Sequence, residues 1–466
     1  MWRPDFPVTV TRLKQGGNKL GTFIPNTREE QLKMLNEIGY KDFDDLFKVI
    51  PDEAKVKGEL DLPEGMSEIG VDRRIRGLAD KNVVFRSIFR GAGAYNHYVP
   101  SAVDAIANKE EFLTAYTPYQ AEISQGILQS IFEYQTMIAE ITGMDIANAS
   151  LYDGASAAAE ACWMCKDRRH STIYVSGAID ERILTVINTY SFGRESKVVV
   201  IPEKNGVTDA EALKAALAED PQAACFLMQY PNFYGIVEDA EELCNITHEA
   251  GAKFIMYVHP LSLGVLKNPG EIGADIAVGE GQPLGLGLEF GGPYLGLLAT
   301  RQENMRQIPG RLIGETVDTR GERGFVLTIQ AREQHIRREK ASSNVCSNEA
   351  WCALRAGIYL STIGPKGFEQ VATLCSSKAH YMAEELGKIG MKRCFEGEFW
   401  NEFATTCPDA DKLLAALEEK GILGGLKLCC GCCGEDCDTD CILWCCTELN
   451  SKEDIDEVIA IAKEVF

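Results

Sequence analysis

The sequence predicts an α/β fold in which a large domain with a mostly parallel sheet precedes a smaller α/β domain. Between about residues 151 and 300, short apolar runs rich in β-branched residues alternate with helical stretches. Strands that are apolar along their whole length and separated by helices are typical of a parallel sheet covered on both faces. After about residue 348, two long helices are followed by a helix, a strand and a last helix, which favours a second, smaller domain.

The elements follow in chain order. Thr27 and Glu30 form a capping box that begins a helix ending near Ile38, before Gly39. From residue 49 to 88 the chain is polar and contains prolines, so we expect an irregular connector there. The strands expected next are Thr172–Val175, Lys197–Ile201, Cys225–Gln229, Phe254–Val258, Ile276–Val278 and Tyr294–Ala299. We therefore divide the chain into an N-terminal arm and helical connector (1–88), a large domain (89–330) and a small C-terminal domain (331–466).

The charge balance excludes several classes of function. The 466 residues include 47 Lys and Arg against 69 Asp and Glu, a formal net charge of −22. Proteins that bind nucleic acid or anionic membranes rely on clustered Lys and Arg, so neither partner is expected. No apolar run approaches the roughly 18–20 residues that span a bilayer, and the first residues lack the apolar core of a secretory signal. We expect a cytoplasmic protein.

Ligands of an open parallel sheet bind at the carboxyl ends of its strands. Three segments fall there. Asp153 precedes a helix, where it is expected to cap the helix rather than leave its amides free for a phosphate. His259 ends an apolar strand and is either a cofactor contact or, more simply, a satisfied histidine beside a proline turn. The segment Ala277–Pro283 contains no nucleophile, and we expect no general base of useful pKa in it.

Five longer stretches carry a family resemblance. They are Phe23–Thr27, Phe89–Pro100, Phe112–Glu122, Phe290–Pro293 and Arg332–Ala341. With them the chain, from about Gly21 to its end, resembles the N-terminal subunits of the glycine cleavage system P-protein. The resemblance implies the fold of the pyridoxal-phosphate-dependent transferases (aminotransferase fold type I), with a mixed seven-stranded sheet. It also implies that this chain pairs with a homologous subunit 2 in a heterotetramer. Subunit 2 is then the partner that carries the pyridoxal phosphate (PLP).

The cofactor positions of that fold are degenerate in this chain. Aligning Gly291–Pro293 with the partner's equivalent turn places Gln282 where the Schiff-base lysine belongs, and an amide forms no imine. His259 stands where an acid faces the pyridine nitrogen, and Asp153 lies in the phosphate cradle. We therefore expect no cofactor-binding and no catalytic residue of this chain's own.

The resemblance implies decarboxylation of glycine and transfer of the aminomethyl group to the lipoyl arm of H-protein. Loops of this chain are expected to line the partner's active site, or else to anchor the interface. The candidates are Tyr95, Asn96, His97, Tyr116, Thr117, Tyr119 and Gln120. Arg337 and Arg338 are candidates for docking the acidic H-protein; a solvated helix face explains them equally well.

The 17 cysteines are concentrated near the C-terminus, where eight lie between Cys429 and Cys446. The loop 429–441 departs from the resembled family. Its C-x-x-C spacing is typical of zinc or iron–sulfur ligation, and a redox-active or merely tolerated loop is the alternative. The candidate metal ligands are Cys429, Cys430, Cys432, Cys433, Cys437 and Cys441.

Two other functions remain open. One is a self-sufficient PLP-dependent aminotransferase or decarboxylase with an unrecognised lysine. The other is a metal- or redox-responsive regulatory subunit built on a fold that has lost its cofactor.

Overall fold

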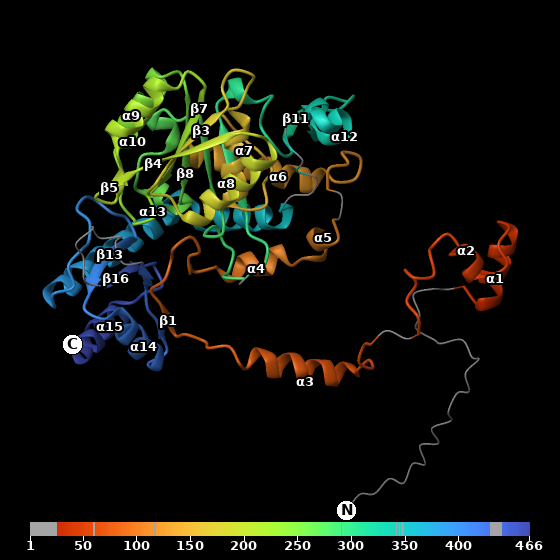
Figure 1. Ribbon diagram of the computed structural model, residues 1–466, viewed down its shortest axis with the longest axis horizontal. Coiled ribbons are helices and arrows are strands. Elements are labelled where there is room, and N and C mark those ends of the chain that lie inside the picture. Colours follow the sequence, from red (N-terminus) through yellow and green to blue (C-terminus); the bar gives the residue numbers. More distant parts are fainter. Residues whose placement is uncertain are drawn as a thin grey trace, which may run out of the picture. The chain divides into compact units, whose positions relative to one another are not determined.

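The computed structural model describes residues 26–58, 61–115, 118–289, 291–341, 343, 345, 349–428 and 440–466. The chain forms two compact units, Met1–Asn82 and Val83–Phe466. The described part of the first unit contains helices α1 (Arg28–Glu37), α2 (Phe43–Leu46) and α3 (Glu68–Ala79), drawn in red and orange in Figure 1. The two units are described separately below.

The first unit confirms one prediction and corrects another. The Thr27 side chain accepts from the Glu30 backbone N–H, and the Glu30 carboxylate accepts from Thr27, so the predicted capping box begins α1. The irregular connector expected from 49 to 88 is wrong over α3, which Ser67 caps. None of the residues of α3 is buried, although Val71, Ile75 and Leu78 recur along it at helical spacing, so the sequence did carry an amphipathic helix signal here.

The second unit is built on a seven-stranded sheet with the order β2-β10-β9-β8-β7-β3-β4. The strands are β2 (Ile146–Ala147), β3 (Thr172–Ser176), β4 (Lys197–Ile201), β7 (Ala223–Tyr230), β8 (Lys253–Val258), β9 (Ile276–Glu280) and β10 (Gly296–Thr300). Strands β4, β3, β7, β8 and β9 are parallel, and β10 is antiparallel to both of its neighbours. The predicted, mostly parallel sheet is confirmed.

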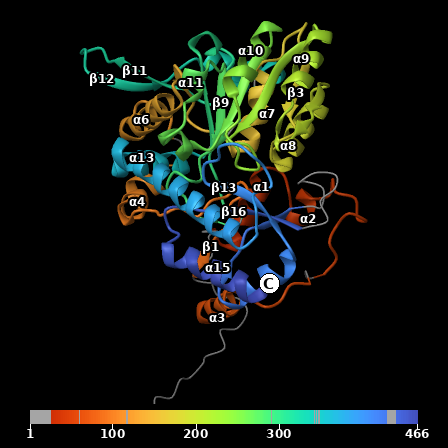
Figure 2. The same ribbon diagram turned by 90° about the vertical axis from the view of Figure 1, so that its left-hand side faces the viewer.

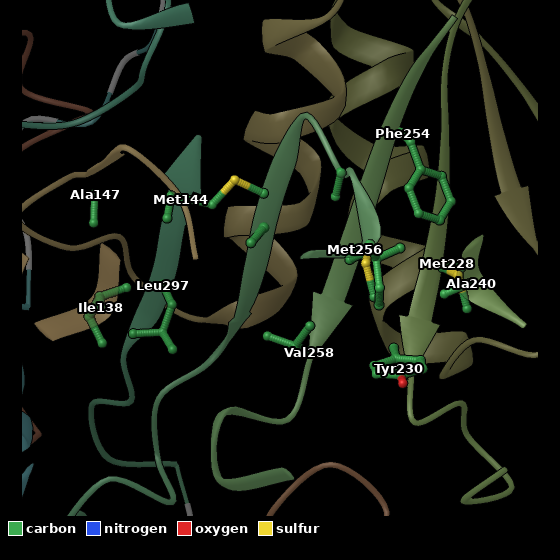
Figure 3. Packing of buried hydrophobic residues seen from close by; sticks show 14 of the residues in the cluster. Ile138, Met144, Ala147, Met228, Tyr230, Ala240, Phe254, Met256, Val258 and Leu297 are labelled. Atoms are coloured by element: carbon green, nitrogen blue, oxygen red, sulfur yellow. The ribbon is translucent and has the colours of Figure 1, made fainter. Parts of the chain in front are cut away.

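Helices cover both faces of this sheet. Phe226 and Met228 of β7 pack into a core with α6 (Gln125–Thr142) and α13 (Ala350–Lys388). Cys225 and Leu227 face a second core with α7 (Gly154–Met164) and α8 (Glu181–Gly193). Figure 2 shows α6 and α13 on one side of the sheet and α7 and α8 on the other. In Figure 3, side chains of neighbouring strands meet in the first core. Burial on both faces explains why these strands are apolar throughout.

The remaining helices beside the sheet are short. They are α4 (Ser101–Ala107), α5 (Glu110–Leu113), α7 (Gly154–Met164), α8 (Glu181–Gly193), α9 (Ala210–Glu219), α10 (Ala240–Glu249), α11 (Pro269–Ile272) and α12 (Gln334–Arg337). Two hairpins, β5 (Glu203–Lys204) with β6 (Val207–Thr208) and β11 (Ile313–Val317) with β12 (Arg323–Leu327), lie outside the main sheet.

The long helix α13 (Ala350–Lys388) joins the main sheet to the C-terminal part. Its backbone leaves helical geometry at Gly364, directly before Pro365, so a kink separates two helical stretches and the two consecutive helices predicted here are confirmed. Cys352 and Ala372 pack into the core of the large sheet, and Met382 packs into the C-terminal core. The division between large and small domains at residue 330 stays a prediction.

The C-terminal part contains a three-stranded antiparallel sheet, β13-β16-β15. Its elements are β13 (Glu402–Cys407), α14 (Ala410–Glu419), β14 (Ile422–Leu423), β15 (Leu426–Leu428), β16 (Asp440–Cys445) and α15 (Lys452–Val465). Strand β1 (Ser87–Ile88) pairs with β14 and brings the segment after it to the junction with the large sheet. Among the described helices, none has the length and apolar character that crossing a membrane requires.

Candidate functional site

A cavity of about 210 Å³ lies at the carboxyl ends of β7, β8 and β9. This is the edge at which the sequence predicted the ligand site of a parallel sheet. The polar residues that line it are Tyr95, Asp153, Asp180, Arg182, Gln229, Asn232, Tyr257, His259, Glu280, Tyr294, Asn401 and Glu402. Two of the three degenerate positions, Asp153 and His259, therefore line one cavity.

The N-terminus of α7 points its amides at this edge, and carboxylates of the chain already bind them. The Asp153 side chain accepts from the Ser156 N–H at 2.7 Å, as the predicted helix cap. Glu280, at the end of β9, accepts from the Gly154 N–H at 2.9 Å. A phosphate at this helix start would meet two carboxylates instead of free N–H groups.

Glu280 was not among the predicted site residues, yet it is central to the cavity. Its other carboxylate oxygen accepts from the backbone N–H groups of Gln282 and Leu295, at 2.9 and 3.0 Å. Burial outweighs these bonds and raises the pKa of Glu280 to about 7. The expectation that Ala277–Pro283 holds no acid or base of useful pKa is wrong, because burial depends on the fold and leaves no mark in the local sequence.

Gln282 is fully buried beside the cavity, and its amide is fully engaged. Its Oε1 accepts from the Tyr95 N–H at 2.8 Å, while its Nε2 donates to the carbonyl oxygens of Tyr95 and Leu286, at 2.8 and 2.9 Å. The side chain thus pairs with both backbone groups of Tyr95. An amide at this position holds the segment around Tyr95 against the sheet.

Glu402 closes the cavity from the C-terminal sheet. It accepts from the Ala92 N–H at 2.6 Å and from the Tyr95 hydroxyl at 2.8 Å. Burial raises the pKa of Glu402 to about 7 and, together with the Glu402 charge, raises that of Tyr95 well above its ordinary value. The Tyr95 side chain is therefore directed into this chain and stays a protonated phenol.

The His259 ring is enclosed by aromatic groups. It makes edge contacts with Tyr95 and Trp400, with ring centroids 4.4 and 4.7 Å apart, and its centroid lies 5.8 Å from that of His97. Both of its ring nitrogens are buried and lack a hydrogen-bond partner among the described residues. Burial, with a smaller effect of His97, holds the pKa of His259 well below its ordinary value, so the ring is neutral.

His97 is held by Glu448, which follows β16. His97 Nδ1 lies 2.7 Å from a Glu448 oxygen, and the Tyr98 N–H donates to the other oxygen, also at 2.7 Å. The Cys375 thiol lies 3.5 Å from Glu448, which makes this trio a group of metal-ligating types within 4.8 Å of one another. Glu448 thus bonds to both His97 Nδ1 and the Cys375 thiol, while the buried His97 Nε2 has no partner among the described residues, and we assign no metal to the trio.

The other predicted site residues lie elsewhere. Asn96 is partly exposed, beside the buried Tyr95 and His97. Tyr119 stacks against Arg311, with 4.2 Å from the guanidinium to the ring centroid, and packs into a core at α6 and β12, so neither it nor Gln120 lines the cavity. Tyr116 and Thr117 lie outside the described residues.

Two further sets of predicted residues lie apart from the cavity. Arg337 and Arg338 are exposed, at and just after the end of α12. Cys441 is buried in β16, with its sulfur 3.5 Å from that of Cys394. The other candidate ligands, Cys429, Cys430, Cys432, Cys433 and Cys437, fall outside the part of the chain that the structure describes. The metal prediction for this loop stays a prediction.

A seven-stranded sheet with this order, its cavity at the strand ends and a smaller antiparallel sheet beside it define the aminotransferase-like class of PLP-dependent transferase folds. The chain belongs to the glycine cleavage system P-protein family, whose model matches residues 21–462. It is 47% identical over 448 residues to the probable glycine dehydrogenase (decarboxylating) subunit 1 of Desulfitobacterium hafniense, covering 95% of this chain and 99% of that protein.

Other similar proteins agree with this assignment. The corresponding subunit of Carboxydothermus hydrogenoformans is 48% identical, over 86% of this chain and 91% of that protein. A crystal structure of glycine decarboxylase (P-protein) of the glycine cleavage system, in inhibitor-bound form, is 42% identical with a TM-score of 0.86 and covers 96% of this chain and 100% of that one. Alanine–glyoxylate aminotransferase from Nostoc is 18% identical, covers 82% of this chain and 96% of that one, and, with a TM-score of 0.55, shares the fold alone.

The residues at the cavity do not fit PLP, the cofactor that the fold class implies. PLP needs a lysine amine, an acid beside the pyridine nitrogen and donors for a phosphate. No lysine is among the described residues that line the cavity, and Lys253 lies at the opposite end of β8, near Asp275 and Asn304. The neutral His259 supplies no counter-charge, and Asp153 with Glu280 already binds the helix amides.

Proposed function

We propose that this chain is the cofactor-free subunit of a two-subunit glycine dehydrogenase (decarboxylating) in the cytoplasm. It pairs with a homologous subunit 2, which binds PLP. The pair decarboxylates glycine and passes the aminomethyl group to the lipoyl arm of H-protein. The high identity to proteins called subunit 1 supports the pairing, and the chemistry of the cavity supports the division of roles.

Gln282 is the observation that carries this proposal. It stands where the alignment through Gly291–Pro293 places the Schiff-base lysine, and its side chain is wholly occupied by hydrogen bonds to Tyr95 and Leu286. A lysine at the same place would leave the Tyr95 N–H without its acceptor. At this position a side chain that bonds to the backbone of Tyr95 and Leu286 replaces one that would bind the cofactor. These bonds help to stabilise the fold without PLP.

The segment that Gln282 holds is our candidate for contact with the partner's active site. Asn96 is the partly exposed member, and Tyr95 and His97 fix its backbone from inside through Glu402 and Glu448. We propose that Tyr116, Thr117, Tyr119 and Gln120 contribute to the same wall or to the subunit interface. We also propose that H-protein docks on the exposed Arg337 and Arg338. A further proposal is that the cysteine-rich loop 429–441 binds a metal.

The test is an absorption spectrum of the purified full chain titrated with PLP, before and after addition of subunit 2. We expect no Schiff-base band from the chain alone and a band from the mixture equal to that of subunit 2 by itself. Glycine decarboxylation should require both subunits. A band from the lone chain that borohydride abolishes would refute the proposal and favour a self-sufficient PLP enzyme. Elemental analysis of anaerobically purified chain decides the metal question separately.

A further inference from the structure

We propose that the cavity left at the former cofactor site binds a small organic ammonium ion, a protonated primary amine of a few carbon atoms. Such a ligand takes no part in the glycine reaction. Its binding rests on the proposed function only in that this chain holds no PLP, which leaves the cavity without a ligand.

The charges around the cavity are the first observation. Four carboxylates line it, Asp153, Asp180, Glu280 and Glu402, against a single guanidinium, Arg182. Arg182 is already paired with Asp180 through Nε and Nη2 and also donates to the Ala92 carbonyl. Three carboxylates therefore share the cavity without a cation of their own. Buried negative charge is costly unless a cation accompanies it, so the cavity selects for positive charge.

Hydrogen-bonding groups left over in the cavity are the second, independent observation. Both His259 nitrogens are buried and unpartnered among the described residues, and the neutral ring keeps one of them as an acceptor. Asp153 uses Oδ1 to cap α7 and, as a carboxylate that lines the cavity, offers further acceptor capacity there. An ammonium group is a donor only, with three N–H bonds, so it matches acceptors of this kind.

The walls of the cavity favour an organic cation over a metal ion. Tyr95, Tyr257 and Tyr294 are among its lining residues, and aromatic side chains can attract ammonium groups. Within the described ranges, one group of possible metal ligands lies close enough together to hold an ion, and it consists of His97, Cys375 and Glu448. None of the four cavity carboxylates belongs to this group. Spread carboxylates with aromatic walls suit a ligand that has both a charged end and an apolar stem.

The size and the helix start exclude other ligand classes. A cavity of about 210 Å³ is smaller than the roughly 300–1,000 Å³ of sites for drug-sized molecules, so the ligand has few non-hydrogen atoms. Anions are disfavoured because Asp153 and Glu280 already occupy the amides of α7 that would bind them. The raised pKa values of Glu280 and Glu402, both about 7, are what burial produces while no cation compensates their charge.

The test is isothermal titration calorimetry of the purified full chain, alone and combined with subunit 2, using ethylammonium chloride at constant ionic strength. Propanol, a neutral molecule of similar size, and sodium acetate are the comparison ligands. We expect saturable binding of one ethylammonium per chain, and at least tenfold weaker binding of both comparison ligands. The measurement needs no glycine turnover, so its failure and that of the glycine reaction are distinguishable.

Two matched substitutions connect binding to the cavity. Asp153→Asn removes the charge and keeps a good helix cap, and it should weaken ethylammonium binding at least tenfold. Asp209→Asn makes the same change at the cap of α9, outside the cavity, and should alter binding less than twofold. Absence of saturable binding, equal binding of propanol or acetate, or equal effects of the two substitutions would each overturn the proposal. Equal melting temperatures of the two variants show that folding is not the cause.

Discussion

At the scale of single residues, Gln282 is the side chain whose replacement is most informative. It is fully buried and forms three hydrogen bonds to backbone groups. Gln282→Ala leaves these three buried groups unpaired. Since each unpaired buried group costs roughly 1–3 kcal/mol, we expect the free energy of unfolding to fall by at least about 3 kcal/mol. Denaturant unfolding followed by circular dichroism measures it.

Gln282→Glu is the matched comparison. It keeps the acceptor for the Tyr95 N–H but loses the donor to the carbonyls of Tyr95 and Leu286, and it adds a carboxyl group beside Glu280. We expect Gln282→Glu to be at least as destabilising as Gln282→Ala. If neither substitution changes stability by more than the error of the measurement, the structural role given to the amide is wrong.

Glu402 predicts how stability depends on pH. Its pKa is about 7 in the folded chain and 4.5 ordinarily, so the folded state binds the proton more tightly. Stability from this group is fully present below about pH 4.5 and is lost as the pH rises through about 7, a change of about 3 kcal/mol. Glu280, whose pKa is also raised, likewise loses its contribution to stability as the pH rises. Glu448 has a lowered pKa, so its contribution is lost as the pH falls.

The variant Glu402→Gln isolates this contribution. Its amide oxygen still accepts from the Ala92 N–H, and the Tyr95 hydroxyl oxygen can accept from the new amide N–H. Relative to the unchanged chain, the variant should therefore gain stability between pH 5 and pH 7.5, measured by urea unfolding at both values. A difference that is the same at both pH values would contradict the shifted pKa.

At the scale of secondary-structure elements, the kink of α13 depends on one glycine. Gly364 has φ 63° and ψ 178°, a region that residues with a Cβ rarely adopt, and Pro365 follows it. Gly364→Ala should lower the free energy of unfolding by about 1–3 kcal/mol, because alanine is strained in this backbone conformation. The Cβ that alanine adds would contact no neighbouring atom, so the cost comes from the backbone alone. Thermal and denaturant unfolding check the value.

The same helix offers the control. Gly357 has helical geometry, and a Cβ built there would lie 3.8 Å from its nearest neighbour, the Tyr134 Cβ, an ordinary contact. Gly357→Ala should be neutral or stabilise by up to about 1 kcal/mol, since alanine favours helix more than glycine does. Equal losses at the two positions would show that tight packing, rather than backbone conformation, requires glycine in α13.

Elements also show where sequence reasoning succeeds and where it fails. The strand Lys197–Ile201 is confirmed residue for residue, since β-branched residues in a short apolar run favour strands wherever they are packed. Helix α3 was missed although Val71, Ile75 and Leu78 recur at helical spacing, because the polar, proline-containing sequence around it indicated a connector. Its N-cap, Ser67, was a second local signal.

At the scale of the whole molecule, the location of the site was predictable and its chemistry was only partly so. The position of Asp153 and His259 at the cavity was predictable, because ligands of a parallel sheet bind at the carboxyl ends of its strands. Each of the two residues lies directly beside its helix or strand in the sequence. Glu402 comes from another sheet more than 300 residues beyond Ala92, with which it bonds. A long-range contact of this kind has no local pattern, and the burial that moves its pKa exists only once both sheets are folded.

The two compact units predict the effect of truncation. None of the hydrophobic clusters among the described residues includes a residue before Val83. The fragment Val83–Phe466 should therefore fold by itself, with near-ultraviolet circular dichroism like that of the full chain and a melting temperature within about 1 °C, a shift that corresponds to roughly 1 kcal/mol or less for a fragment of this size.

A second truncation, at Ser101, supplies the contrast. It removes Phe89, which is fully buried in the C-terminal core, together with the strand β1 and the Tyr95 and His97 contacts at the cavity. Loss of a buried phenylalanine alone costs about 3–5 kcal/mol, and unpaired Glu402 and Gln282 add to it. We expect this fragment to be poorly folded, without native near-ultraviolet signal. If both fragments melt alike, the residues 83–100 do not join the large sheet to the C-terminal sheet; if the longer one also fails to fold, the core extends into the first unit.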